Sequence, residues 1–423
     1  MSHTDTVKQF AEMLYRAVPR ADIAIRDWEG NRYGPDQSSA TLVLNHPGSL
    51  RAALIAPTDL SAGEAYIYED IDFEGDILAA LYLGNNLDQL RKQPRMLAKA
   101  LNLVRSLPNE SNRRLHRRPR LSGRLHSMAR DRQAISSHYD TGNEFFSLFL
   151  DPSKTYSCAY FLDPLESLEI AQRRKLDLVS RKLLLRPGLS LLDVGSGWGS
   201  MLLHAGKNCD VVGHGITLSH EQFEESNRRF ADVGLGHQLA VEMKDYREVS
   251  GSFDAISSIG MFEHVGAGQL TTYFEKMFGL LKPGGLMLNH GITTRERRRL
   301  PRLRETFVST HVFPDGELLP IENVIQAAED AGFEVRDVES LRMHYALTLR
   351  NWIANLESNR ERAIKLTSEK TYRTWRIYMA GSVVGFETAG ISVYQMILAK
   401  PNTPWQFGRR WAVAADDTAE AGS

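Results

Sequence analysis

Cysteine is scarce in this sequence, and long apolar runs are absent. Two cysteines among 423 residues, Cys158 and Cys209, exclude a disulfide scaffold or a zinc site built on cysteine and fit a reducing cytoplasm. The longest apolar run, 77–83, is far shorter than the about 18 residues of a membrane span. The N-terminus, MSHTDTVKQF, lacks the apolar core of a signal peptide. We therefore expect a cytoplasmic protein without a metal site, at most peripheral to the inner face of a membrane.

Charge is balanced over the whole chain but uneven along it. Lys and Arg number 51 against 52 Asp and Glu. The stretch 105–135 is rich in arginine, contains Pro108, Pro119 and Gly123, and has no sustained apolar period, so we interpret it as a linker. It has no aromatic residue between 105 and 132 to stack on nucleic acid. Its arginines either lie in a solvated tether or attract an anionic surface. We expect that surface to be a membrane. The two basic clusters are Arg113, Arg114, Arg117, Arg118, Arg120, Arg124 and Arg130 in the linker, and Arg295, Arg297, Arg298, Arg299, Arg302 and Arg304 downstream.

Pattern and composition divide the chain into four parts. We expect residues 1–104 to form a small α+β domain, 105–135 the linker, 136–400 a catalytic domain and 401–423 a tail. In the first part we expect helices over 7–18 and 76–90 and short strands at 41–44 and 52–55. Lipid docking and homodimer formation are two roles that the sequence leaves open for this domain.

The third part alternates strands with helices. Such alternation predicts an α/β domain with a doubly wound, mostly parallel sheet. The last two strands alternate in polarity and predict a closing antiparallel pair. The expected strands are 189–194, 211–216, 253–259, 286–292, 333–338 and 391–398, and the expected helices are 219–233 and 269–281.

A glycine-rich turn joins the first of these strands to a helix. It reads Asp193-Val-Gly-Ser-Gly-Trp-Gly199, in which Gly195 and Gly197 permit close backbone approach to a ligand. A structural turn and a dinucleotide site are alternatives, but the spacing is D-x-G-x-G-x-G rather than GxGxxG. The pattern resembles motif I of class I S-adenosylmethionine-dependent methyltransferases.

Four further segments carry chemistry at strand ends or upstream of the sheet. Each has an ordinary structural reading by itself: a helix cap, a surface turn, a satisfied polar pair and a buried aromatic segment. The segments are GITLSHEQ at 215–222, KDYR at 244–247, SIGMFEHVG at 258–266, and HYDTGN with DPSKTYSCAYF at 138–161.

Together with HYALTLRNW at 344–352, these motifs resemble the cyclopropane-fatty-acid synthases and mycolic-acid cyclopropane synthases over about residues 130 to 400. The extra N-terminal region is similar in placement to that of the phospholipid-acting synthases. The resemblance implies S-adenosylmethionine as cofactor. It implies Tyr156 and Ser157 at the carboxylate end of the cofactor, Gly195 and Gly197 at its methionine part, Thr217, Leu218 and Gln222 at its ribose, and Asp245, Tyr246 and Ile259 at its adenine.

The resemblance also implies a bound bicarbonate ion that acts as the base. It would lie among Cys158, Glu263, His290, the backbone of Ile292, and Tyr345. Because an anion would then lie beside a carboxylate, we expect Glu263 to stay neutral or share a proton. The segment 390–395 has no cysteine, which excludes a thiol nucleophile there.

Three functional hypotheses remain open on the sequence. The first is a cyclopropane-fatty-acyl-phospholipid synthase: methyl transfer to the cis double bond of an unsaturated phospholipid acyl chain gives a carbocation, whose deprotonation closes the ring. The second starts with the same transfer and gives a methylene- or methyl-branched chain. The third is a non-catalytic lipid- or nucleic-acid-binding protein with a degenerate methyltransferase fold. The glycines and Glu263 are intact, which argues against degeneration.

Overall fold

The structure is a computed structural model that describes residues 2–18, 21–56, 58–86, 93–115, 123, 126–139, 141–295 and 305–404. The contacts within the chain divide it into two compact units. One comprises Met1–Leu121, Arg299–Pro314 and Trp352–Gly385, and the other comprises Ser122–Arg298, Asp315–Asn351 and Phe386–Ser423. Some of the sequence predictions lie outside the described residues: Arg117, Arg118, Arg120, Arg124, Asp140, Arg297, Arg298, Arg299, Arg302, Arg304 and the tail from 405.

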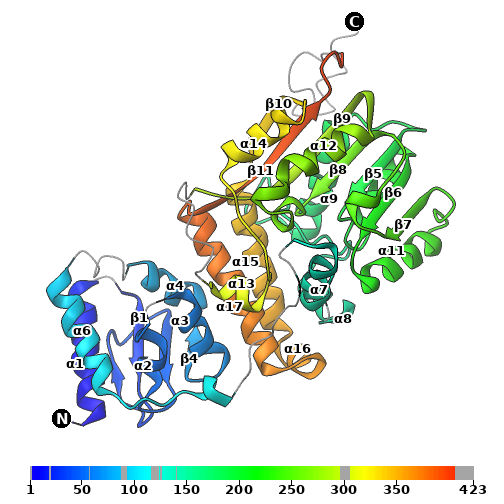
Figure 1. Cartoon of the computed structure of the whole chain (residues 1–423). Coiled ribbons are helices and arrows are strands. Elements are labelled where there is room, and N and C mark those ends of the chain that lie inside the picture. The colour runs from blue at the N-terminus through cyan, green and yellow to red at the C-terminus, as the bar shows by residue number, and fades with distance from the viewer. Residues whose placement is uncertain are drawn as a thin grey trace, which may run out of the picture. The chain divides into compact units, whose positions relative to one another are not determined.

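The first unit is built on a four-stranded sheet in the order β2-β1-β3-β4 (Figure 1). The pair β1 and β3 is parallel, and the pairs β1–β2 and β3–β4 are antiparallel. Its strands are β1 Ile23–Arg26, β2 Arg32–Tyr33, β3 Ala40–Leu44 and β4 Ile71–Gly75. Its helices are α1 His3–Ala17, α2 Ser49–Leu54, α3 Asp59–Ile67, α4 Ile77–Asn86, α6 Pro94–Ser106, α13 Phe307–His311, α16 Arg360–Leu366 and most of α17 Glu369–Glu387, with the 3₁₀ turn η1 Asn112–Leu115.

Late segments of the chain belong to this first unit through specific contacts. The Phe307 N–H donates to Asp59 at the start of α3 (2.9 Å). On α17, the Arg376 guanidinium donates to the Tyr66 hydroxyl (3.0 Å), and Arg373 bridges the Tyr66 carbonyl and Asp72. Because these partners are up to 310 positions apart, no local pattern could have indicated them.

One predicted strand in this unit is wrong. Residues 52–55 were expected to be extended, but 52–54 belong to helix α2. The chain turns just before: the Gly48 N–H donates to Nδ1 of His46, and Ser49 accepts from the His46 N–H. Leu50 and Ala53, three positions apart, then share the buried helix face. A four-residue apolar run cannot by itself distinguish a buried strand from a helical turn.

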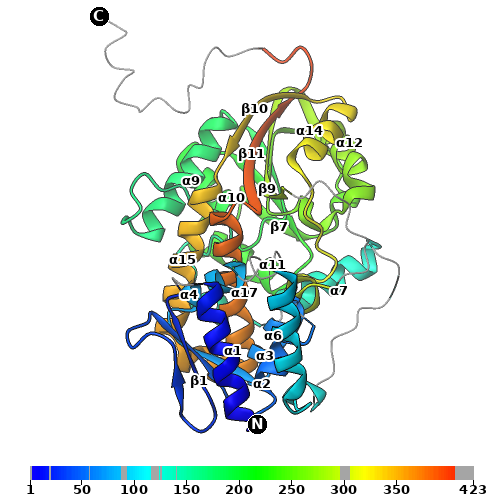
Figure 2. The same ribbon diagram turned by 90° about the vertical axis from the view of Figure 1, so that its left-hand side faces the viewer.

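The second unit has the predicted α/β architecture with a mostly parallel sheet. Its seven-stranded sheet has the order β10-β11-β9-β8-β5-β6-β7. The strands from β9 to β7 are parallel neighbours, and β11 runs antiparallel between β9 and β10 (Figure 2). The strands are β5 Ser190–Val194, β6 Val212–Thr217, β7 Leu239–Met243, β8 Phe253–Ile259, β9 Leu281–Thr294, β10 Glu334–Ser340 and β11 Ile391–Ala399. The sequence missed β7, a short strand in which Leu239 and Val241 are buried and Ala240 is exposed.

Two apolar clusters cover the two faces of this sheet. One joins α12 and α14 to it through residues such as Phe274 and Val324, and the other joins α9, α10 and α11 through Val179, Leu202 and Phe230 (Figure 1). Such sheets bind ligands at the carboxyl ends of their parallel strands. The helices are α7 Met128–Tyr139, α8 Asn143–Phe146, α9 Leu168–Lys182, α10 Ser200–Cys209, α11 His220–Asp232, α12 Leu270–Leu280, α14 Ile321–Asp330 and the part of α15 Arg342–Ser358 up to Asn351, with 3₁₀ turns η2 Tyr246–Glu248, η3 Phe262–His264 and η4 Ala267–Gln269.

Candidate active site

The glycine-rich loop lies between β5 and α10, as predicted. Gly195 and Gly197 have φ of 76° and 53°, a conformation that L side chains rarely adopt. The N–H groups of Gly195 and Ser196 both donate to the Ile216 carbonyl at the end of β6, which holds the loop against the next strand. A Cβ placed on Gly197 would meet no atom within 4 Å. The loop thus leaves open space beside Gly197.

The upstream aromatic segment packs on this loop. The indole of Trp198 donates to the Asn143 side chain (2.6 Å), and its ring lies 4.9 Å from that of Phe146. Tyr156 packs edge-on against Phe146, with ring centroids 5.5 Å apart. Through these contacts, the segment that contains Tyr156 and Ser157 packs on the loop that contains Gly197. The sequence alone did not show that these two motifs are in contact.

A buried lysine lies under Ser157. Lys175 on α9 is 1% exposed, and its ammonium donates to the Ser157 Oγ (2.8 Å). Burial lowers the pKa of Lys175 to about 8. Because an ammonium can only donate, the Ser157 oxygen accepts, and its own hydrogen is left to point toward another acceptor. Sequence reasoning missed Lys175, although its spacing from Ala171 and Leu178 on the buried face of α9 marks it as an unusual core residue.

The side of the site predicted to bind ribose and adenine lies at the ends of β6, β7 and β8. The Thr217 hydroxyl donates to the Gln222 side chain (2.7 Å), and both residues are buried. Asp245 follows β7 and accepts two bonds from the Arg247 guanidinium (2.7 Å each). Tyr246 is buried with its ring edge-on to Tyr273. The remaining predicted residues, Leu218 and Ile259, are half-buried just after β6 and at the end of β8.

Glu263 is held in the turn η3 against strand β9. Its Oε1 accepts from the Ile292 N–H (2.7 Å), so this N–H, predicted to face the bicarbonate ion, binds the carboxyl of Glu263 here. The ring of Phe262 packs so close to Gly291 that a Cβ there would lie 2.0 Å from it. Oε2 of Glu263 is buried without a hydrogen-bond partner among the described residues. Burial raises the pKa of Glu263 to about 7.

His290 lies on β9, two residues before Ile292. The ring is buried, with Nδ1 3.0 Å from the side-chain amide nitrogen of Gln395 on β11. Its Nε2 is also buried and has no hydrogen-bond partner in the described part of the chain. Burial and the nearby Lys175 and Lys182 hold the pKa of His290 well below its usual range, so the ring is neutral.

Cys158 and Tyr345 are the remaining residues predicted to surround the bicarbonate ion. The Cys158 sulfur is fully buried and lies 3.7 Å from the Leu341 carbonyl oxygen. Leu341 directly precedes α15, and its carbonyl also accepts from the Tyr345 N–H (3.1 Å). Burial raises the pKa of the Cys158 thiol, which therefore stays protonated and is no nucleophile. Tyr345 is half-buried, with its ring 4.9 Å from that of Phe386. Among the described residues no cluster of three or more His, Cys, Asp or Glu could hold a metal ion.

Comparison with known proteins shows the family to which this chain belongs. A family model described as mycolic acid cyclopropane synthetase matches residues 126–396. The chain belongs to this family. As a member, it is an S-adenosylmethionine-dependent methyltransferase. It is 36% identical to a probable fatty acid methyltransferase of Pseudomonas putida, over 92% of this chain and 94% of that protein.

Further relatives agree with the family assignment. A probable fatty acid methyltransferase of Mycobacterium tuberculosis is 35% identical over 93% of this chain and 96% of its own length. Among solved structures, the cyclopropane synthase MmaA2 from Mycobacterium tuberculosis matches with a TM-score of 0.61 and 35% identity, covering 64% of this chain and 98% of that one. The predicted family and fold are thus confirmed, whereas the roles of the individual site residues stay predictions.

Proposed function

We propose that this family member transfers the methyl carbon of S-adenosylmethionine to the cis double bond of unsaturated phospholipid acyl chains and forms a cyclopropane ring. The observation that carries the proposal is the pair of buried, unpartnered atoms described above, Oε2 of Glu263 and Nε2 of His290. Buried polar atoms rarely lack partners, so a small polar guest is expected beside each of these atoms. The two relatives reported above, which match over 92% and 93% of this chain, are named as probable fatty acid methyltransferases, which supports the acyl substrate.

The residues present fit S-adenosylmethionine. Open space beside Gly197 leaves room for the cofactor, and the Lys175–Ser157 pair offers a hydroxyl and a positive charge for its carboxylate. When bound, the cofactor supplies an electrophilic methyl group. The alkene cannot be activated by removing a proton, so the main contribution of the protein is to align the alkene with the methyl group. Such alignment can lower the activation barrier by about 7–11 kcal/mol.

The residues also fit a bicarbonate ion, the base that we propose. Bound there, it would supply an oxygen that accepts a proton from the new methyl group. Glu263, with its pKa raised to about 7, is largely neutral in weakly acidic solution and can share a proton with such an anion. Neutral His290 can donate a hydrogen bond without adding charge. Glu263, His290 and Cys158 are all buried, so the proposed bicarbonate site excludes water that would otherwise trap a carbocation on the acyl chain.

An alternative product has support from the comparisons. The chain is 34% identical over 289 residues to a tuberculostearic acid methyltransferase of Mycobacterium tuberculosis. A methylene or methyl branch begins with the same transfer, so the site serves both outcomes. The intact Glu263 and His290 favour ring closure.

The product distinguishes these proposals. We would incubate the protein with S-adenosylmethionine and vesicles of unsaturated phospholipid, then record proton NMR spectra of the released fatty esters. Cyclopropane protons upfield of all other chain protons are the expected result. Vinylidene or branched-methyl signals in their place would contradict ring formation and favour the alternative, and an unmodified lipid would contradict both.

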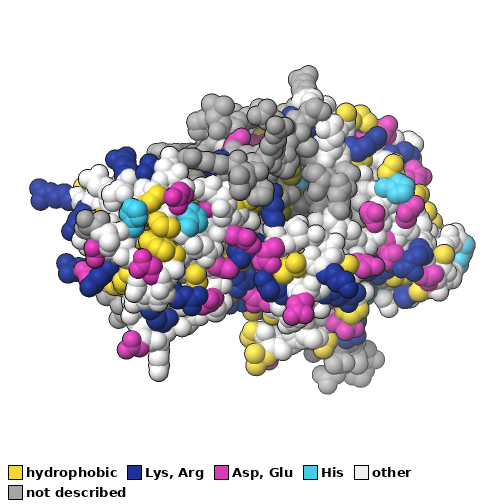
Figure 3. Space-filling model, turned by 90° about the horizontal axis from the view of Figure 1, so that it is seen from below, with side chains coloured by type: hydrophobic (Ala, Val, Ile, Leu, Met, Phe, Trp, Pro, Cys, Tyr) yellow, Lys and Arg dark blue, Asp and Glu magenta, His cyan; other side chains and the backbone are white. Residues whose placement is uncertain are grey.

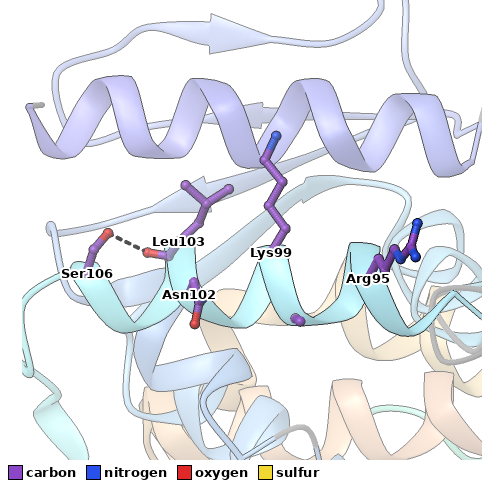
Figure 4. A pocket seen from close by; sticks show the side chains of 6 residues that line it. Arg95, Lys99, Asn102, Leu103 and Ser106 are labelled. Atoms are coloured by element: carbon purple, nitrogen blue, oxygen red, sulfur yellow. Dashed lines mark hydrogen bonds between the residues drawn. The ribbon is translucent and has the colours of Figure 1, made fainter.

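We further propose that the protein binds anionic membranes peripherally. No helix of the described chain combines the length and apolarity needed to cross a membrane. On the face in Figure 3, basic and acidic side chains are interspersed over the described surface. Attraction to an anionic membrane must therefore come from local clusters of basic residues. One described cluster is helix α6, which carries three cations and no carboxylate. Arg95 and Lys99 extend from it beside a shallow hollow (Figure 4).

A further inference from the structure

Three buried side chains, Lys182, Gln395 and His290, form a continuous hydrogen-bonded relay. Lys182, at the end of α9, is 0% exposed, and its ammonium donates to Oε1 of Gln395 (2.8 Å). The amide nitrogen of Gln395, also 0% exposed, lies 3.0 Å from Nδ1 of His290. Strands β9 and β11 place Gln395 directly opposite His290. Lys182 also pairs with Glu339 on β10, which anchors the relay at its far end.

Each link of this relay admits only one direction of donation. An ammonium has no acceptor, so the Gln395 oxygen must face Lys182 and its NH₂ group must face His290. That NH₂ group can only donate, so Nδ1 of His290 must accept. In a neutral imidazole one nitrogen accepts and the other carries the hydrogen. The remaining hydrogen of His290 therefore belongs on Nε2, the atom with no partner in the described structure.

We infer that Lys182 and Gln395 are positioning residues, which hold His290 as the neutral tautomer with its hydrogen on Nε2. The site is thereby equipped with a fixed donor for an anion. The tautomer follows from the relay alone, whereas the role of the donor toward bicarbonate rests on the proposed function. Without the relay, the ring could place its hydrogen on Nδ1 and turn an acceptor toward the anion.

The tautomer can be measured directly in the unmodified protein. We would label histidine with ¹³C and ¹⁵N, identify the His290 signals by their loss in a His290→Asn variant, and record the ring shifts at about pH 8. The expected result is a neutral ring with the hydrogen on Nε2. A hydrogen on Nδ1, an imidazolium ring or an even mixture of tautomers would overturn the inference, whatever reaction the protein catalyses.

A nearly isosteric substitution tests the consequence. In Gln395→Glu the carboxylate can accept from both Lys182 and His290, so the hydrogen is expected to move to Nδ1. The bicarbonate concentration for half-maximal activity should rise about tenfold or more, since one hydrogen bond to a charged group is lost. The affinity for S-adenosylmethionine, measured by calorimetry, should stay unchanged. Gln37→Glu, at an exposed position of the first unit, is the matched control and should keep both values.

The outcomes separate this inference from the proposed function. An inverted tautomer with unchanged bicarbonate dependence would overturn the role of the donor. A protein that forms no cyclopropane, or needs no bicarbonate, would contradict the proposed function but leave the tautomer to the NMR measurement. Should Gln395→Glu fail to fold, Lys182→Met removes the group that orients the amide. Both tautomers should then appear in its spectrum, and an unchanged single tautomer would contradict the relay.

Discussion

The ammonium of Lys175 donates to the Ser157 hydroxyl oxygen at 2.8 Å, inside a site where both side chains are buried. The lysine comes from the buried face of α9, and the serine from the segment that packs on the glycine-rich loop. The pair gives the site a hydroxyl whose hydrogen is free to meet a carboxylate, with a positive charge behind it.

Replacing this lysine should weaken cofactor binding. Lys175→Met is expected to lower the affinity for S-adenosylmethionine about tenfold, because a charge-assisted contact is lost. Since the pKa of Lys175 is about 8, the affinity of the unmodified protein should fall as pH rises through that value, and the variant should lack this fall. Calorimetry from about pH 7 to 9 measures both effects. Lys207→Met, at an exposed position of α10, is the control. Equal affinities in the Lys175 variant would remove the lysine from the cofactor site.

The carboxyl of Glu263 should matter for turnover rather than for cofactor binding. Glu263→Gln keeps the size of the side chain and can still accept from the Ile292 N–H. We expect turnover to fall by about a hundredfold or more, as for loss of an acid–base group, with S-adenosylmethionine affinity nearly unchanged. A fully active variant would exclude Glu263 from the catalytic residues.

The same carboxyl predicts a dependence of stability on pH. Its pKa rises from 4.5 to about 7 on folding, so between these values the folded state binds more protons than the unfolded state. The contribution of Glu263 to the free energy of unfolding is therefore fully present below about pH 4.5 and is lost as pH rises through about 7. Urea unfolding at several pH values should show this loss in the unmodified protein and a smaller one in Glu263→Gln. Identical pH profiles would contradict the raised pKa.

The open space beside Gly197 can be closed by a side chain. Gly197→Val is expected to abolish measurable S-adenosylmethionine binding, because the valine occupies that space. The matched control is Gly234→Val, since Gly234 also has a positive φ, 77°, with no atom within 4 Å of its Cβ position. The backbone strain is then similar in both variants. Loss of binding in both would show that strain, and not obstruction, is responsible.

The packing of Phe262 on Gly291 should position Glu263. In Gly291→Ala the new Cβ would lie 2.0 Å from the Phe262 ring, so the turn η3 must move and the Glu263–Ile292 bond should break. We expect lower turnover with retained cofactor affinity, and partial recovery of turnover when Phe262→Leu is added. Gly279→Ala, on α12 with open space at its Cβ, is the control. If adding Phe262→Leu does not restore turnover, the packing of Phe262 on Gly291 is not the cause of the loss.

Membrane binding should depend on charge. Binding to vesicles is expected to need anionic lipid and to weaken as salt rises, because exposed charges are screened. The double variant Arg95→Glu and Lys99→Glu should bind less, and sedimentation with vesicles measures this. Equal binding to neutral lipid, or at low and high salt, would rule out electrostatic docking.

Much of the architecture was predictable from local pattern. The apolar strands 189–194 and 253–259 became β5 and β8, and Gly195 and Gly197 have the positive φ that their turn requires. These features depend on residues close together in the chain. The motif at 258–266 contains Glu263, and the family resemblance implied a role for His290.

Tertiary structure alone decided what those side chains contact. Gln395 is 105 positions from His290 and 213 from Lys182, and only the antiparallel register of β9 and β11 places it opposite the histidine. Likewise, Lys175 becomes a site residue because α9 packs its buried face under Ser157. A local pattern can indicate that a polar residue will be buried, but the partner that satisfies it comes from a distant segment, and that partner sets the proton positions and charges on which the chemistry depends.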